Sequence, residues 1–123
     1  CLLSRGLGDV YKRQRQGDEQ WFNVVRWSLN AMLEAEEYGI TSKNVDDMLK
    51  STNPNVQRIL GVTPGMGKNL GLDDKWAYNI IKQVGNYGES YDRAMGKESP
   101  LKLDRGLNKL WTQGGLMYGW PVR

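Results

Sequence analysis

Glycine and proline divide this chain into short stretches, and most of the stretches between them carry a helical pattern. The 123 residues include 15 glycines and four prolines, and both residue types are unfavourable in the interior of a helix or strand. No segment alternates polar and apolar residues as a half-buried strand does, and no internal repeat is present. The sequence therefore predicts a mainly α chain of about five helices with Gly- and Pro-rich loops.

The strongest helical pattern begins at Asp18 and Glu19, whose negative charge suits the start of a helix. Apolar residues then recur at spacings of four, four and three, which predicts one apolar stripe along an amphipathic helix. Gly39 predicts the end of this helix. The predicted stripe consists of Trp21, Val25, Leu29 and Met32, flanked by Val24, Ser28, Ala31 and Ala35.

Two shorter helices and a loop are expected next. Thr41 or Ser42 is predicted to cap a helix that runs to about Lys50. Asn53 followed by Pro54 predicts the start of a third helix, because proline suits the first helical position. Residues 61–71 contain four glycines and one proline and are therefore predicted to form a flexible loop.

The rest of the chain is predicted to alternate short helices with breaks. Asp73 is expected to cap a helix in which Trp76, Ile80 and Val84 share a face. Residues 85–88 are expected to end it, and short helical turns are expected at 89–95 and 104–111. The tail, rich in glycine and aromatic residues, is predicted to be extended.

The composition excludes several kinds of site. The chain has no histidine and a single cysteine, Cys1, which excludes a histidine base, histidine-ligated zinc and an internal disulfide within it. No run approaches the about 20 apolar residues of a membrane-spanning helix, so direct membrane insertion is not expected. The 17 basic and 14 acidic residues are interspersed, so nucleic-acid binding is disfavoured.

Residues 1–14, CLLSRGLGDVYKRQ, show no helical or alternating pattern. They resemble the translated read-through of a sequencing adapter, and the string GDVYKRQ carries that resemblance. We expect a non-native, disordered leader here, with an ordinary flexible N-terminus as the alternative. On this interpretation the genuine protein begins upstream of Arg15, and residues 15–123 are a C-terminal fragment.

Three features invite a functional interpretation, and each has a simpler structural one. The run Gly65-Met66-Gly67-Lys68 departs from the phosphate-binding pattern in its glycine spacing and has Asn69 where a hydroxyl is required, which favours a plain loop. Paired carboxylates can serve acid–base chemistry or bind a cation, but their positions favour capping and solvation. The pairs are Glu36/Glu37, Asp46/Asp47 and Asp73/Asp74.

The aromatic residues can stack on sugars or bases. Trp21 and Trp76 lie on apolar stripes, which favours the core, and Trp120 near the end of the tail is expected to be a docking anchor. Residue chemistry alone therefore predicts no catalytic residue, no metal site and no cofactor, and the ligand-binding residues stay unknown. The other aromatic residues considered are Trp27, Trp111, Tyr78, Tyr87, Tyr91 and Tyr118.

The order of several strings resembles one family over essentially all of residues 15–123. The strings are RQGDEQWFNVVRW, EEYGIT, NP-x-V-x-R-x-LG, VGNYGE and RGLNKLWTQGGLMY. They look like the C-terminal part of general L-amino-acid-binding proteins, the periplasmic substrate-binding subunits of polar amino-acid ABC transporters. The resemblance implies a two-lobed α/β parent, in which this piece supplies the C-terminal helices of the first lobe.

The same resemblance implies the function of the parent. It would be a non-enzymatic periplasmic protein that closes around an L-amino acid and presents it to an ABC transporter permease. In this family an Arg holds the α-carboxylate and an Asp the α-amino group, as charge-assisted pairing with a zwitterion requires. These residues are expected upstream of the fragment, so the fragment alone is expected to bind no ligand. We further expect it to be marginally stable, to associate or to form a molten state, because helices that cover a sheet expose apolar stripes when the sheet is absent.

Two other interpretations stay open at this point. The first is a self-contained small helical module that holds a protein or a glycan. The second is a fragment of an enzyme, for instance a cell-wall lyase with a related two-lobed domain.

Overall fold

The computed structural model describes residues 17–122, and one long helix, α2 (Glu19–Glu37), forms its centre. The Asp18 side chain accepts a hydrogen bond from the N–H of Trp21 at 3.0 Å, which caps the start of α2 as its sequence suggests. Gly39, with φ of +67°, and the N–H of Ile40, which returns to the carbonyl of Ala35, close its end. Both predicted ends are therefore confirmed.

The other elements are short. They are α3 (Val45–Met48), α4 (Pro54–Ile59), η1 (Lys68–Leu70), α5 (Trp76–Val84), α6 (Tyr87–Ala94), η2 (Gly106–Asn108) and η3 (Trp111–Gln113), where η marks a 3₁₀-helix. In the described part of the chain the only β contact is an isolated parallel bridge between Leu110 and Met117. The mainly α prediction is therefore confirmed.

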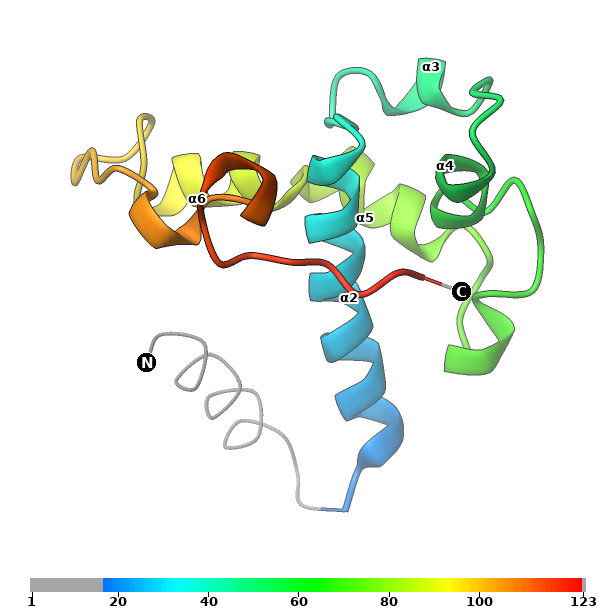
Figure 1. Ribbon diagram of the computed structural model, residues 1–123. Coiled ribbons are helices and arrows are strands. Elements are labelled where there is room, and N and C mark those ends of the chain that lie inside the picture. Colours follow the sequence, from blue (N-terminus) through cyan, green and yellow to red (C-terminus); the bar gives the residue numbers. More distant parts are fainter. Residues whose placement is uncertain (1–16, 123) are drawn as a thin grey trace.

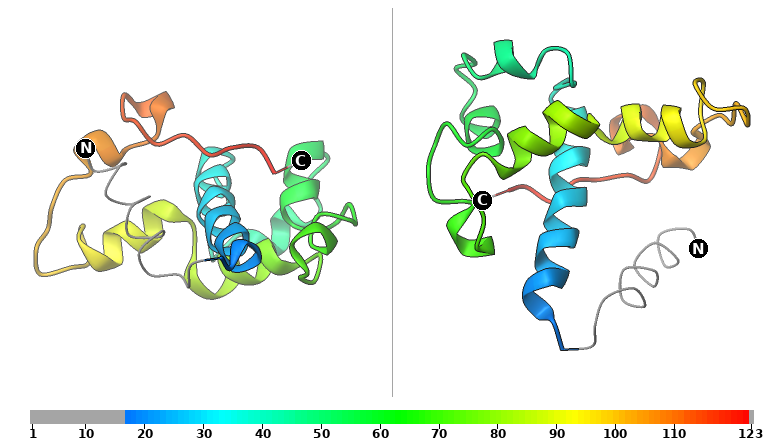
Figure 2. Two further views of the ribbon diagram at one scale, coloured as in Figure 1. Left: turned by 90° about the horizontal axis from the view of Figure 1, so that it is seen from below. Right: turned by 180° about the vertical axis from the view of Figure 1, so that it is seen from behind.

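Helix α2 lies between two layers. Helices α5 and α6 cross one side of it, and the extended C-terminal tail crosses the opposite side (Figure 1; Figure 2, left). Helices α3 and α4 and the loop after α4 lie beyond one flank of α2, and the segment after α6 lies beyond the other. Figure 2 (right) also shows that the N-terminal half of α2 extends past α5 and α6.

Two apolar clusters fill the spaces between these elements. The larger one joins α2 to α3, α4 and α5, and Val122 of the tail closes it. The smaller one joins Leu33 to Leu110 and Met117, with Tyr87 packed against it. The larger cluster comprises Ala31, Ala35, Ile40, Val45, Val56, Ile59, Leu60, Trp76, Ala77, Ile81 and Val122.

The predicted stripe of α2 is wrong as a description of what the helix buries. Ala31 and Ala35 are fully buried, but Trp21 is 55% exposed and Leu29 42% exposed. The cause is position along the helix, because α5 and α6 cross only its C-terminal half (Figure 2). The expectation of a core position is therefore wrong for Trp21 and confirmed for Trp76, which is 7% exposed.

Helix starts account for the other differences. Asn44, not Thr41 or Ser42, occupies the N-cap position of α3, and Lys75, not Asp73, that of α5. Helix α6 begins at Tyr87, inside the predicted break, because Asn86 and Glu89 form a capping box. The predicted start of α4 at Pro54, with Asn53 as its cap, is confirmed.

Candidate functional site

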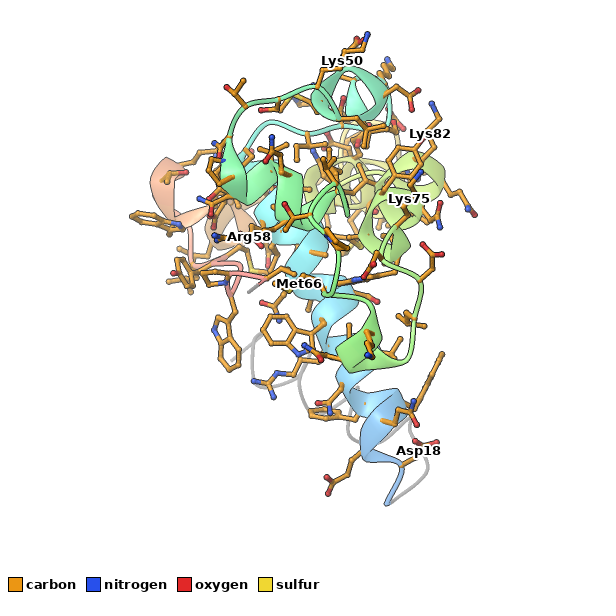
Figure 3. All side chains as sticks on the ribbon, turned by 90° about the vertical axis from the view of Figure 1, so that its right-hand side faces the viewer. Asp18, Lys50, Arg58, Met66, Lys75 and Lys82 are labelled. Atoms are coloured by element: carbon orange, nitrogen blue, oxygen red, sulfur yellow. The ribbon has the colours of Figure 1, made fainter. Side chains whose placement is uncertain are left out.

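A small cavity is the first place to look for a ligand. It has a volume of about 110 Å³ and lies between α2, η1, α5 and the tail. Figure 3 shows Met66, one of its lining residues, beside α2 in the loop that follows α4. The lining carries no charged side chain, and the volume is well below the roughly 300–1,000 Å³ of a typical ligand pocket. Its lining residues are Trp27, Met66, Asn69, Leu70, Trp76 and Val122.

The glycine-rich loop is closed by a carboxylate of the chain itself. The N–H groups of Gly65 and Gly67 both donate to Oδ1 of Asp74, at 2.9 and 3.1 Å. A Cβ at Gly67 would lie 2.3 Å from the carbonyl oxygen of Asp73, so only glycine fits there. Since Asp74 already occupies these donors, the loop is not built for phosphate. Its predicted irregular form holds in part, because residues 68–70 form η1.

Glu36 and Arg105 form a largely buried ion pair between α2 and the start of η2. The Arg105 Nη1 group pairs with Oε1 of Glu36, and Nη2 donates to Oε2 at 3.0 Å. Their side chains are only 11% and 15% exposed. Burial acts to lower the pKa of Arg105, but the hydrogen bond to Glu36 and the attraction of nearby negative charge, that of Glu36 first, together raise it above the ordinary value. The expectation that Glu36 is solvated is therefore wrong.

The surroundings of this pair explain two of the strings noted in the sequence. Arg105 Nη2 also donates to the carbonyl of Asn108 at 2.9 Å, and its guanidinium lies 5.5 Å from the ring centroid of Tyr87. A Cβ at Gly88 would lie 2.8 Å from Oε1 of Glu36, so a larger residue where α6 meets α2 would have to displace this carboxylate from its pair with Arg105. The strings GNYGE and RGLN thus meet at one structural junction.

A second polar junction ties the end of α2 to α6. Glu89 accepts hydrogen bonds from the hydroxyl of Ser42 at 2.7 Å and from the N–H of Asn86 at 2.9 Å. The buried amide of Asn86 donates to the carbonyl of Ile40 at 2.7 Å. Burial alone raises the pKa of Glu89, but the hydrogen bonds from Ser42 and Asn86 outweigh it and lower the pKa.

The tail is held by three polar side chains on one face of α2. Oε1 of Glu37 accepts from the N–H of Gly119 at 3.2 Å, and Oδ1 of Asn30 accepts from that of Trp120 at 2.8 Å. Oε2 of the buried Glu34 accepts from the N–H of Val122 at 2.9 Å. Since Pro121 has no N–H, every backbone donor from residue 119 to 122 has a partner on α2. Sequence patterns identify these residues as helical, but they do not show this contact.

The other carboxylate pairs have structural partners or lie at the surface. Asp46 accepts from the hydroxyl of Tyr78 at 2.7 Å and pairs with Lys82, which lies on the outer side of α5 (Figure 3). The hydrogen bonds from Lys82 and Tyr78 lower the pKa of Asp46. Asp73 accepts from the N–H of Lys75 at 2.7 Å. Among residues 17–122, no three acidic or cysteine side chains are grouped as a metal ion requires.

The aromatic residues of the tail and of η3 are exposed and partly paired with each other. The rings of Trp111 and Tyr118 meet edge to face, with centroids 6.0 Å apart. The ring of Trp120, 49% exposed, lies 4.3 Å from the guanidinium carbon of Arg26. Trp27 and Tyr78 pack against the larger cluster. No helix in the described part of the chain is long and apolar enough to span a membrane.

Comparison with known proteins gives a consistent result. No protein-family model matches the chain. It is 56% identical over 118 residues to YhdW of Escherichia coli (strain K12), a candidate amino-acid ABC transporter-binding protein, a match that covers 95% of this chain and 34% of YhdW. It is 53% identical over 111 residues to the general L-amino acid-binding periplasmic protein AapJ of Rhizobium johnstonii, covering 89% of this chain and 33% of AapJ.

A solved structure agrees with these matches. An ABC transporter periplasmic binding protein from Brucella ovis, with glutathione bound, is similar with a TM-score of 0.85 and 57% sequence identity. The match covers 89% of this chain and 35% of that chain. The chain thus spans about a third of the length of the relatives that it matches. The predicted leader, residues 1–14, lies outside the described residues.

Proposed function

This chain is a segment of an amino-acid ABC transporter-binding protein, and from that premise we propose that its full-length parent captures L-amino acids in the periplasm for an ABC transporter permease. The observation that carries this proposal is the 53–57% identity to such proteins over nearly the whole chain. The parent acts by binding and release, not by catalysis.

The role of this segment within the parent is structural. An amino-acid site needs charged partners for the α-carboxylate and the α-amino group of its ligand. The cavity of the segment is about 110 Å³ and has no charged lining residue. Glu36 and Arg105, two charged groups of the segment that could pair with a zwitterion, pair with each other at the junction of α2 and η2. These observations support the proposal that the ligand residues belong to the rest of the parent.

Calorimetric titration with a panel of L-amino acids tests this proposal. One sample is the chain alone, and the other is a chimaera in which residues 15–123 replace the matching third of YhdW from Escherichia coli. We expect binding by the chimaera and none by the chain alone. Stoichiometric binding by the chain alone refutes the structural role, and a folded chimaera without affinity for any L-amino acid refutes the proposed ligand class.

The exposed aromatic residues favour one alternative function, a helical module that holds a glycan or a protein. Trp111, Tyr118 and Trp120 are each about half exposed near the tail. A screen of immobilised glycans with the unsubstituted chain and with Trp111→Ala distinguishes the two functions. Binding that depends on Trp111 supports the module, whereas the transporter function predicts no retained glycan.

We also propose that residues 1–14 are a non-native leader. Their likeness to a translated sequencing adapter supports this origin, while the match to YhdW, which spans 118 residues and therefore extends into residues 1–14, opposes it. Sequencing the source DNA across the codons for Gln14 and Arg15 tests it. A frame that continues upstream into further binding-protein sequence supports the proposal, and an encoded CLLSRGLGDVYKRQ in the source DNA refutes it.

A further inference from the structure

One side of the N-terminal half of α2 is apolar and largely bare. Trp21, Val25, Leu29 and Met32 recur at spacings of four, four and three, so they lie on one side of the helix. Trp21 is 55% exposed and Leu29 is 42% exposed, while Val25 and Met32 are half-buried. We call these four residues the α2 face.

The position of the α2 face explains why it is bare. Further along the helix, the same side of α2 meets α6, where Glu36 pairs with Arg105 beside Gly88. Towards its start, α2 extends beyond α5 and α6 (Figures 1 and 2), with Asp18 at the far end (Figure 3). Among the described residues, the loop around Gly71 approaches this half of the helix at Gln20, which lies on another side.

The chemistry of the α2 face specifies an apolar occupant. Between Trp21 and Met32 the only charged residue is Arg26, whose guanidinium lies beneath the ring of Trp120 on the side that meets the tail. A face without charge offers nothing to lipid phosphates or nucleic acid. Exposed apolar residues that share one side of a helix are typical of a packing surface.

We propose that the α2 face is the surface on which the rest of the parent chain packs. This inference rests on the proposed function, since it requires that the chain be part of a longer binding protein. The related Brucella ovis protein superposes on these helices with a TM-score of 0.85, yet this chain covers only 35% of it. Most of that protein therefore lies outside the part that resembles this chain. The corresponding part of this chain's own parent supplies the apolar surface that covers the α2 face.

The substitution Leu29→Asp tests the inference in two contexts, the chain alone and the YhdW chimaera. Asn23→Asp is the matched control, because Asn23 is an exposed residue of the same helix on a different side. In the chain alone, we expect Leu29→Asp to leave the helical circular dichroism unchanged and to reduce self-association. In the chimaera, we expect it to lower the melting temperature by about 5–10 °C, because it buries a charge, while Asn23→Asp has no effect.

Equal melting temperatures for the two chimaera variants overturn the inference. So does failure of the unsubstituted chimaera to fold, because the other two thirds of YhdW then do not fit this surface. A chain that dimerises through the α2 face, with no effect of Leu29→Asp in the chimaera, assigns the surface to a second copy instead. A folded chimaera that binds no amino acid but is sensitive to Leu29→Asp refutes the proposed function alone.

Discussion

Replacing Arg105 by methionine is the perturbation with the largest expected effect on the folded chain. The substitution keeps a long apolar side chain but leaves the carboxylate of Glu36, 11% exposed, without its partner. It also removes the hydrogen bond to the carbonyl of Asn108 and the cation above Tyr87. The pair with Glu36 joins α2 to the segment after α6, the contact with Tyr87 joins that segment to α6, and the bond to Asn108 holds the segment's own turn.

The magnitude follows from the burial of the pair. Removing one partner of a fully buried ion pair costs about 3–5 kcal/mol, and the slight exposure of both side chains places Arg105→Met near 3 kcal/mol. This is a large part of the about 5–15 kcal/mol that holds a typical domain together. Because the chain alone is expected to be only marginally stable, the loss is measured by urea denaturation of the YhdW chimaera, followed by circular dichroism at the helical band.

Two further variants make the test specific. Lys82→Met removes the ion pair with Asp46, whose two side chains are 45% and 53% exposed, and its unfolding midpoint is expected to match that of the unsubstituted chimaera. Adding Glu36→Gln to Arg105→Met removes the stranded charge and is expected to restore part of the lost stability. Equal losses for Arg105→Met and Lys82→Met refute the reasoning, as does a double variant less stable than the single one.

Two other predictions concern loops and pH. Asp74→Ala removes the acceptor of the Gly65 and Gly67 N–H groups, so limited proteolysis is expected to cut residues 61–71 faster than in the control Asp47→Ala, which changes an exposed residue. Equal rates of cleavage contradict the role of Asp74. Because the pKa of Glu89 in the folded chain lies below its ordinary value of 4.5, its carboxylate stabilises the fold above that pH, and this stability is lost as the pH falls below it. Glu89→Gln is expected to flatten the pH dependence of the unfolding midpoint between about pH 5 and 3, and an unchanged slope contradicts the assignment.

Local signals in the sequence were sufficient for the helices and several of their ends. Asp18, Gly39 and the Asn53-Pro54 pair each act within one helical turn, so their effect can be predicted without tertiary structure. The start of α6 was also available, because Asn86 followed three residues later by Glu89 is a capping-box pattern. Gly85 and Gly88, which lie beside this pattern, led instead to the prediction of a break.

What each helix buries could not be predicted in the same way. The apolar spacing of Trp21 and Leu29 marks a side of α2 correctly, but it cannot show that α5 and α6 reach only the other half of the helix. The partners of Glu34, Glu36 and Glu37 are at least 69 residues away in the sequence. Composition and periodicity carry no information at that range, so buried and paired carboxylates look like solvated ones.

The family strings were identified from their resemblance to known binding proteins, and the structure explains two of them physically. Gly88 and Arg105 meet at Glu36, which accounts for the string GNYGE and for the start of RGLN as parts of one junction. These two strings join α2, α6 and the segment after α6.

Amide hydrogen exchange along α2 tests most directly the claim that this chain is an uncovered part of a larger binding protein. In the chain alone, we expect fast exchange in the N-terminal half of α2, around Trp21 and Val25, and slow exchange around Ala31 and Ala35, which are fully buried. In the YhdW chimaera, we expect slow exchange in both halves. Equally fast exchange of the N-terminal half in both proteins would contradict the account.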